Sequence, residues 1–318
     1  MNSLLGACSV LGAGFGLYVS YKFLDAIFLY SLSSDLSPYL RPSSGGKPAW
    51  ALVTGASDGI GRSLASELAS RGLNVVLHGR NASKLEDVQA ELSQSHPARS
   101  FRALVADASQ VHTSAVDFAA LARSLEHLHL TVLVNNVGRG PAPAFGALET
   151  YPASDILSVI HLNAAFPALL TAALLPLLHR NGPGLVVNVA SITDQGLPLV
   201  SFYGAAKAFG HVLALALWRE ARLDRRDVRV ISHRVGAVTG VSHVRDPGTL
   251  WRPDAATVAR RIVGLSGCGR KSVVPYWPHA LQQLMLSLLP EWVADRVLMG
   301  VMRDERTNQD AEGKGKEE

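Results

Sequence analysis

The stretch Trp50-Ala-Leu-Val-Thr-Gly-Ala-Ser-Asp-Gly-Ile-Gly61 decides the fold of this chain. Its glycines follow an apolar run and precede a helix-like segment at residues 62–70. Glycines at such a turn let the backbone approach a pyrophosphate, and the N–H groups at the start of the helix favour the negative charge. The spacing is G-x-x-x-G-x-G, and its place after a buried strand favours a dinucleotide-binding turn over an ordinary tight turn.

Outward from this turn, short apolar runs alternate with helical patterns, as a parallel α/β sheet requires. Several runs are almost wholly Val, Leu and Ala, which is typical of strands covered by helices on both faces. The sequence therefore predicts one α/β domain with a doubly wound, seven-stranded parallel sheet of the Rossmann type. The expected strands are the run at Trp50 and residues 74–77, 101–106, 131–135, 185–190, 228–233 and 273–275. The expected helices include 82–95, 109–126, 153–178, with Pro167 and Pro176 as candidate breaks, and 201–223.

A tyrosine and a lysine in Tyr203-Gly-Ala-Ala-Lys207 have the spacing that places two side chains on one face of a helix. An ammonium group near a phenol favours the ionised phenol and lowers its pKa towards the range useful for acid–base catalysis. The same spacing occurs by chance in surface helices, so its meaning depends on the motifs that accompany it.

Six motifs occur in the order found in the short-chain dehydrogenase/reductase family, which the chain resembles from about residue 48 to residue 302. They are Thr54 to Gly61, Asp107, Asn135-Asn-Val-Gly138, Asn163, Ser191, and Tyr203 with Lys207. The resemblance implies that a nicotinamide hydride adds to a carbonyl carbon while Tyr203 gives a proton to the oxygen. It also implies that Ser191 polarises the carbonyl, that Lys207 binds the nicotinamide ribose and lowers the pKa of Tyr203, and that Asn163 positions a relay water.

The same resemblance implies a set of cofactor-binding residues. They are Gly55, Ser57, Asp58, Gly59, Ile60, Gly61, Arg62, Arg80, Asp107, Asn135, Val137, Tyr203, Lys207, Val238 and Thr239.

A narrower resemblance is to the membrane-bound branch that contains very-long-chain 3-oxoacyl-CoA reductases and related 17β-hydroxysteroid dehydrogenases. It depends on four features of the sequence: the motif Asp58-Gly-Ile-Gly61, the valine at position 137 (Val137), the apolar leader, and the C-terminal segment Leu288-Leu-Pro-Glu-Trp-Val293.

The end of the second strand, Val75-Val-Leu-His-Gly-Arg80, bears on the choice of cofactor. Enzymes that prefer NAD usually carry an acid here for the ribose 2′-hydroxyl, and this segment has none. Arg80 and Arg62 are instead suited to a 2′-phosphate, so we expect NADPH and reduction as the working direction. The alternative is that both arginines are merely solvated.

Two departures from the family pattern affect the expected site. Ser191 lies twelve residues before Tyr203 where the family usually has thirteen, so the loop at 192–198 is one residue short, and counting back thirteen reaches Ala190. We assign Ser191, because strand register is harder to shift than loop length. Further on, Val235-Gly-Ala-Val-Thr-Gly240 replaces P-G-x-x-x-T, which puts Thr239 one place early for a contact with the nicotinamide amide.

The N-terminal leader predicts a membrane anchor. It has no charged residue from Ser3 to Tyr21, and after Lys22 and Asp25 an apolar run resumes as far as Leu32, which is enough to cross a bilayer. No basic residue precedes the apolar stretch, which argues against a secretory signal. Basic residues after it predict a catalytic domain in the cytosol. The alternative is a helix lying on the surface of the domain.

The leader sets the predicted domain organisation. We expect an anchor at 1–40, a catalytic domain at 41–303 and a disordered polar tail at 304–318. The ending Lys314-Gly-Lys316-Glu-Glu318 resembles a retrieval signal of endoplasmic-reticulum membrane proteins, which predicts a single-pass protein of that membrane.

The remaining composition excludes several classes of site. Two cysteines, Cys8 and Cys268, and eleven histidines without ligand spacing predict neither a disulfide framework nor a metal site. The net charge of +4 is modest, and the basic run Arg222 to Arg229 is interrupted by acids, so no nucleic-acid partner is expected. Residues 275–302, rich in Leu, Trp and Met, are suited to a lipophilic substrate channel, to a membrane surface or to core packing. A homodimer is a further partner that we consider.

The predicted function is NADPH-dependent reduction of a ketone on a lipophilic substrate, first of all a long-chain 3-oxoacyl-CoA. A steroid, retinoid or polyketide ketone is the alternative substrate. The catalytic residues contact only the carbonyl group, and residues 239–253 would contact the rest of the substrate and so determine which ketone binds. A nucleotide-binding membrane pseudoenzyme is the rival from another class, motivated by the short loop after Ser191 and the missing proline.

Overall fold

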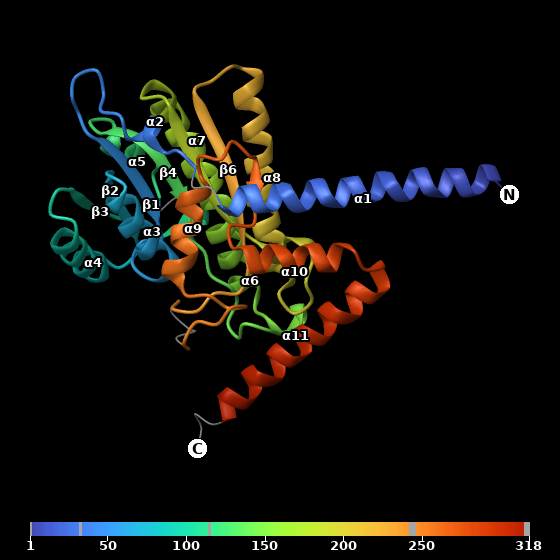
Figure 1. Cartoon of the computed structure of the whole chain (residues 1–318). Coiled ribbons are helices and arrows are strands. Elements are labelled where there is room, and N and C mark those ends of the chain that lie inside the picture. The colour runs from blue at the N-terminus through green and yellow to red at the C-terminus, as the bar shows by residue number, and fades with distance from the viewer. Residues whose placement is uncertain (1, 32–33, 114–115, 242–245, 315–318) are drawn as a thin grey trace.

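A computed structural model of the chain describes residues 2–31, 34–113, 116–241 and 246–314. Seven parallel strands form one sheet in the order β3-β2-β1-β4-β5-β6-β7 (Figure 1). The predicted sheet, with its seven parallel strands, is confirmed. The strands are β1 (Ala49–Thr54), β2 (Asn74–Gly79), β3 (Phe101–Val105), β4 (His129–Asn135), β5 (Gly184–Ser191), β6 (Val228–Val235) and β7 (Ser272–Val273).

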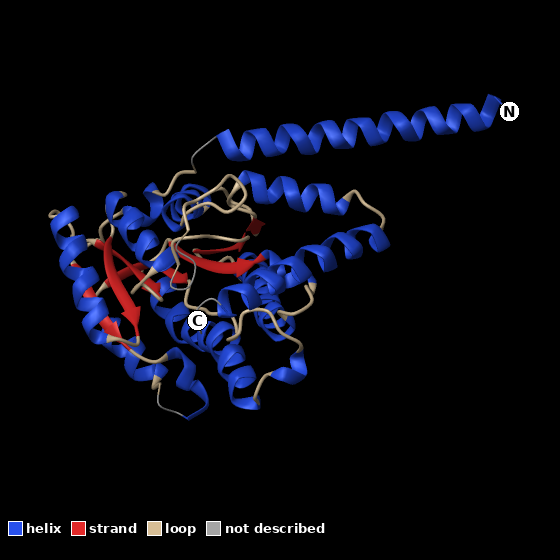
Figure 2. Cartoon of the chain, turned by 90° about the horizontal axis from the view of Figure 1, so that it is seen from below, coloured by secondary structure: helices blue, strands red, loops and turns tan. Residues whose placement is uncertain are grey.

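Helices cover both faces of the sheet (Figure 2), and the alternation of side chains along β1 shows why. Ala51 and Val53 point into one core, which contains the apolar faces of α3 (Gly59–Ser70), α4 (Ala82–Ser95) and α9 (Ala255–Leu265). Trp50 and Leu52 point into the other core, with α5 (Phe118–Leu125), α7 (Phe166–Arg180) and part of α8 (Ser201–Leu223). Strands buried on both faces explain the near-continuous apolar runs of the sequence.

Two predicted helices differ from those observed. Instead of one helix at 109–126, the structure has a 3-10 segment, Ala108–Thr113, and then α5. The predicted helix at 153–178 forms and continues to Arg180, as α6 (Ala153–Ile160), a π-helical turn η3 (His161–Ala165) and α7. Pro167 lies in the first turn of α7, directly after the π-helical turn, and Pro176 is accommodated inside the helix.

The leader forms a long helix, α1 (Asn2–Ser31), that projects from the domain (Figure 1). Its last turns are attached to the domain: Tyr30 donates a hydrogen bond to the Val274 carbonyl over 2.6 Å, and Asp25 pairs with Arg270. The following segment enters the core through Leu36 and through Tyr39 of α2 (Ser37–Leu40). The catalytic domain therefore includes residues before the predicted boundary at 40.

The prediction that the leader spans a membrane is not established by the helices themselves. In the described ranges, the one helical segment long and apolar enough to cross a bilayer is Ala153–Arg180. Leu170 and Leu174 of that segment are fully buried, so it is a core helix.

The predicted disordered tail at 304–318 is wrong for the residues that the structure describes. After α10 (Trp277–Ser287), α11 (Glu291–Lys314) continues through the polar sequence. Glu305 pairs with Arg252 over 2.6 Å, and Gln309 is hydrogen-bonded to both the N–H and the carbonyl of Phe145. These distant contacts order a segment whose composition alone predicts disorder. The terminal retrieval signal lies mostly outside the described residues.

Candidate active site

The glycine-rich turn joins β1 to α3, next to the point where the strand order reverses between β1 and β4. Gly55 adopts a φ of 68°, which favours glycine. A side chain at Gly61 would lie 2.0 Å from the Gly55 carbonyl oxygen, so only glycine permits this approach of helix and turn. Ligands of open α/β sheets bind in the crevice at such a reversal, and the N-terminus of α3 faces it.

Two residues that the sequence analysis did not single out hold this turn against the end of β4. The buried Thr54 hydroxyl accepts hydrogen bonds from the N–H groups of Asn136 and Val137, at 2.9 and 3.0 Å. The Asn136 side chain donates to the Thr54 carbonyl over 2.9 Å. The sequence could have indicated Thr54 and Asn136, because each lies inside one of the two motifs.

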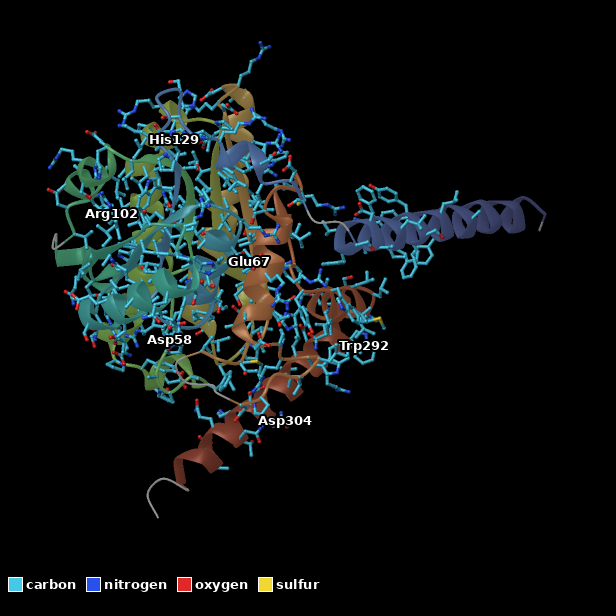
Figure 3. The ribbon with its side chains drawn as sticks, turned by 60° about the vertical axis from the view of Figure 1, so that its left-hand side comes forward. Asp58, Glu67, Arg102, His129, Trp292 and Asp304 are labelled. Carbon is cyan, nitrogen blue, oxygen red and sulfur yellow. The ribbon has the colours of Figure 1, made fainter. Side chains whose placement is uncertain are left out.

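The remaining residues of the turn have structural contacts of their own. Asp58 caps α3 by accepting a hydrogen bond from the Gly59 N–H over 2.7 Å, and Figure 3 marks it at that end of the helix. Ser57 is half-buried, and Ile60 packs against the core. Gly59 has a φ of 55° and lies under Val241, whose side chain would be 3.1 Å from a methyl group at Gly59. The chain after β6 thus covers part of the turn.

Lys207 and Asn163 meet at the end of β4. A methyl group built on Gly138 would lie 2.5 Å from Oδ1 of Asn163 and 2.9 Å from Nζ of Lys207. The Asn163 amide donates to the carbonyls of Arg139 and Val159, both at 2.9 Å. Asn163 lies in the π-helical turn η3, and π-turns frequently occur at functional sites.

Ser191, at the end of β5, is the serine that reaches Tyr203. A hydrogen bond with the Ser191 hydroxyl lowers the pKa of Tyr203, although burial has the larger effect and raises it. Ala190, the alternative position, has no hydroxyl and is buried in the strand. The loop that is one residue short thus still brings Ser191 to the tyrosine.

Close packing compensates for the short loop. The 3-10 turn η4 (Ile192–Gln195) lies so near the first turn of α8 that a methyl group at Gly204 would be 2.7 Å from the Thr193 carbonyl oxygen. Asp194 fixes the turn from below through a two-point contact with Arg234, which includes a 2.7 Å hydrogen bond. Gly204, between the tyrosine and the lysine of the motif, therefore sets the position of Ser191.

The structure corrects the expected electrostatics of the pair. The sequence predicted that Lys207 lowers the pKa of Tyr203, whereas burial raises the pKa of Tyr203 above its usual value of 10.0. The Lys207 ammonium lies 6.0 Å from the centre of the Tyr203 ring, and it donates to the Val189 carbonyl over 3.0 Å. Burial also lowers the pKa of Lys207 to about 8. Removal from water thus decides the direction of both pKa shifts, and the opposing effect is that of the Ser191 hydrogen bond on Tyr203.

The residues expected near the adenine and the 2′-phosphate are only partly arranged for that task. Arg62 forms an ion pair with Glu91 of α4, whereas Arg80 is exposed at the end of β2. The Asp107 carboxylate accepts hydrogen bonds from the N–H and the hydroxyl of Ser109, at 3.0 and 2.7 Å. Burial alone would raise the pKa of Asp107, but these bonds and the nearby Arg80 charge lower it.

Val238 and Thr239 follow β6 on the other side of the crevice. Val238 packs against the core, and Thr239 is almost fully buried, with its hydroxyl donating to the Asp246 carbonyl. Its N–H donates to the Pro253 carbonyl over 2.9 Å. The structure therefore does not aim this threonine hydroxyl at the crevice, and residues 242–245 of the variable segment lie outside the described ranges.

The residues present fit a dinucleotide. The turn at Gly55 and Gly61 is a cradle that side chains would fill. Among the described residues, no hydrogen-bond donor reaches the buried Oδ1 atoms of Asn135 and Asn163, although the Asn135 amide donates to the Thr171 hydroxyl over 2.8 Å. These acceptors lie at the end of β4 and on η3, beside Lys207 and Gly138. A ligand with hydroxyl and amide donors matches them.

Comparisons with known proteins agree with this geometry. The sequence profile of the short chain dehydrogenase family matches residues 49–246. A very-long-chain 3-oxoacyl-CoA reductase of Pyricularia oryzae is 31% identical over 85% of this chain and 82% of its own. The very-long-chain 3-oxooacyl-coA reductase let-767 of Caenorhabditis elegans is 30% identical over 92% of both chains. The human very-long-chain 3-oxoacyl-CoA reductase is 28% identical over 97% of both.

Solved structures give the same result. A short-chain dehydrogenase from Sphingobium yanoikuyae in complex with NADPH is 25% identical, covers 76% of this chain and 97% of its own, and has a TM-score of 0.61. An alcohol dehydrogenase from Thermococcus sibiricus complexed with 5-hydroxy-NADP is 26% identical, with coverages of 68% and 88% and a TM-score of 0.58. The chain therefore belongs to the short-chain dehydrogenase family and is an oxidoreductase that acts on alcohol or ketone groups.

Proposed function

We propose that this protein uses NADPH to reduce the ketone of a long-chain 3-oxoacyl-CoA to a hydroxyl group. The observation that carries the chemistry is the convergence of Ser191, Tyr203, Lys207 and Asn163 beside the glycine-rich turn. The substrate class is supported by relatives about 30% identical over most of the chain, which are named very-long-chain 3-oxoacyl-CoA reductases.

NADPH, when bound, supplies the hydride that adds to the carbonyl carbon. Tyr203 donates its phenolic proton to the carbonyl oxygen, and burial favours the protonated form that this step requires. The Ser191 hydroxyl donates a hydrogen bond to the same oxygen and stabilises its developing charge. The side-chain oxygen of Asn163 accepts a hydrogen bond from the water that returns a proton towards Tyr203. The Lys207 ammonium favours the phenolate left after proton transfer.

NADPH rather than NADH is supported by the end of β2, where Arg80 is exposed and no acid is present. Arg62 supports the choice less, because Glu91 already pairs with it. Two structural relatives hold NADPH or an NADP derivative. Exchanging Arg80 for Asp should therefore shift the preference towards NADH, and the same exchange at Arg180, which is exposed at the end of α7, should leave it unchanged.

The membrane proposal depends on α1. Its described residues expose many large apolar side chains, among them Phe15, Leu17, Phe23 and Phe28, each more than 60% exposed. An isolated projecting helix of this kind is not stable in water without a partner. We therefore propose that α1 crosses the endoplasmic-reticulum membrane once and that the catalytic domain lies in the cytosol, where NADPH is available.

NADPH oxidation by the purified full-length protein tests the function. Long-chain 3-oxoacyl-CoA, a short water-soluble 3-oxo ester, a steroid ketone and a blank without substrate are compared, with Tyr203→Phe as the control. We expect the highest kcat/KM with the long-chain thioester and loss of turnover in Tyr203→Phe with NADPH affinity nearly unchanged. A higher kcat/KM for the steroid would assign the alternative substrate class, and NADPH binding without turnover of any ketone would leave a nucleotide-binding pseudoenzyme.

A further inference from the structure

The turn between α10 and α11 presents an exposed apolar surface. It consists of Leu284, Met285, Leu288, Leu289 and Trp292, and we call these residues the hairpin surface. Leu288 is 58% exposed and Trp292 is 67% exposed, although tryptophan is among the side chains most favoured by burial. A contiguous apolar surface of this kind marks a site of interaction.

The α10 half of the hairpin is uncharged, and the first charged residue after it is Glu291, next to Trp292. No Asp, Glu, Lys or Arg occurs from Ser272 to Pro290. The one histidine of α10, His279, is 1% exposed and points inward, where Nε2 lies 3.1 Å from the Trp251 carbonyl oxygen and burial lowers the pKa of the imidazole. The surface of α10 therefore offers a partner apolar side chains and uncharged polar groups.

The hairpin and α1 leave the domain on the same side. In both ribbon views the α10–α11 turn and α1 point away from the sheet in the same general direction (Figures 1 and 2). In Figure 3, Trp292 lies at the outer end of this hairpin, on the side from which α1 emerges. A bilayer crossed by α1 would therefore meet the hairpin surface.

Charge at the foot of α1 favours a bilayer over a second protein. Arg270, which pairs with Asp25 of α1, lines one cavity together with one acid, Asp227, and four further arginines, Arg222, Arg225, Arg226 and Arg229, of which Arg226 pairs with Asp224. Cationic groups thus gather where α1 enters the domain, while the hairpin carries none up to Pro290. Anionic lipid head groups attract such arginines, and the hydrocarbon below them accepts the uncharged hairpin.

The other half of α11 connects the hairpin to the active site. Met302 is buried, and Glu305 pairs with Arg252 in the variable segment. Gln309 holds the backbone of Phe145 with two hydrogen bonds, in the loop that follows Gly138. One helix therefore begins at the exposed hairpin surface and ends on two segments that border the catalytic residues.

We infer that the hairpin surface inserts into the leaflet that α1 enters, as a second membrane contact that places lipid at the start of the helix reaching the segments beside the catalytic residues. The inference rests on the proposed membrane anchoring by α1. It explains why large apolar side chains at this turn remain exposed in the isolated chain.

Site-directed spin labelling of the full chain tests the inference. Cys8 and Cys268 are replaced by serine, one cysteine is introduced as Leu288→Cys, Val105→Cys or Leu17→Cys, and a nitroxide is attached. Val105 is the matched control, because it is 54% exposed but lies on β3, at the sheet edge opposite to β7. The proteins are reconstituted in phosphatidylcholine and phosphatidylserine vesicles, and circular dichroism checks that each is folded.

We expect the label at 288 to collide with oxygen dissolved in lipid and to lose access to a water-soluble nickel chelate, with the reverse at 105. A label at 288 as accessible to nickel as that at 105 would overturn the inference. Shielding from both reagents would also overturn it, because it would indicate a protein partner such as a second copy. The label at 17 reports separately on anchoring by α1, and NADPH oxidation by the same samples reports on the enzyme.

Discussion

The ammonium group of Lys207 donates a hydrogen bond to the main-chain carbonyl of Val189 over 3.0 Å, two residues before Ser191 on the same strand. The bond ties α8, which carries Tyr203, to β5, which carries Ser191, and so fixes the two reacting groups relative to each other. It also holds a cation out of water, and burial lowers the pKa of Lys207 from 10.5 to about 8. The site is therefore built around a buried ammonium group that lowers the free energy of unfolding at neutral pH.

Replacing this lysine should separate activity from stability. In Lys207→Met we expect reductase activity to fall by at least about 10²-fold. The lowered pKa corresponds to a cost of roughly 3 kcal/mol, against about 1 kcal/mol for the lost hydrogen bond. The free energy of unfolding should thus stay unchanged or rise, as measured by denaturant titration. Lys84→Met, at an exposed position on α4, should alter neither quantity, and a markedly less stable Lys207→Met would contradict the argument.

The lowered pKa of Lys207 also predicts how activity and stability depend on pH. Reduction needs the ammonium, so kcat/KM should fall as the pH rises through about 8. Stability should change in the opposite sense, because between about pH 8 and 10.5 the unfolded chain keeps the proton that the folded chain has lost. The stability gap between Lys207→Met and the native protein should therefore narrow over this interval. A rate profile that stays level up to pH 10 would refute the assignment.

Local pattern predicted most of the fold. The helices at 82–95 and 201–223 have the observed bounds, and all seven strands fall within two residues of the expected ones at each end. These elements follow from the periodicity of apolar residues, which the chain displays directly. The tail was mispredicted because the contacts of Glu305 with Arg252 and of Gln309 with Phe145 join segments far apart in sequence.

The residues of the site were easier to predict than their electrostatics. Motif order indicated Ser191 and Lys207, but the direction of the Tyr203 pKa depends on how deeply the fold buries the phenol. The π-helical turn that carries Asn163 has no signal in the sequence, because it depends on a change of backbone hydrogen bonding within an otherwise regular helical pattern. Thr54 and Asn136 were missed because their role is to join two motifs that were considered separately.

A methyl group at Gly204 should displace Ser191. The nearest atom to that methyl is the Thr193 carbonyl oxygen at 2.7 Å, which belongs to the backbone and must move. We expect Gly204→Ala to lower kcat/KM through η4 while NADPH affinity changes little. Gly264→Ala is the control, since it is also helical and has no neighbour within 4 Å. That variant should be fully active and gain about 0.5–1 kcal/mol of stability from helix propensity. Equal kcat/KM for the two variants would show that Gly204 does not determine the position of Ser191.

Substituting Gly138 tests whether catalysis needs the observed positions of both Asn163 and Lys207. Its added methyl group would lie 2.5 Å from Asn163 Oδ1 and 2.9 Å from Lys207 Nζ, whereas a methyl group at Gly140 has no neighbour within 4 Å. Neither glycine has a positive φ, so alanine suits both backbones and only the contacts differ. We expect Gly138→Ala to reduce kcat by about 10²-fold, because small displacements of catalytic groups have effects of that size. Gly140→Ala should keep the native kcat, and both should show nearly the same melting temperature. If Gly138→Ala retains the activity of Gly140→Ala, Asn163 and Lys207 do not need their observed positions for the proton transfer from Tyr203.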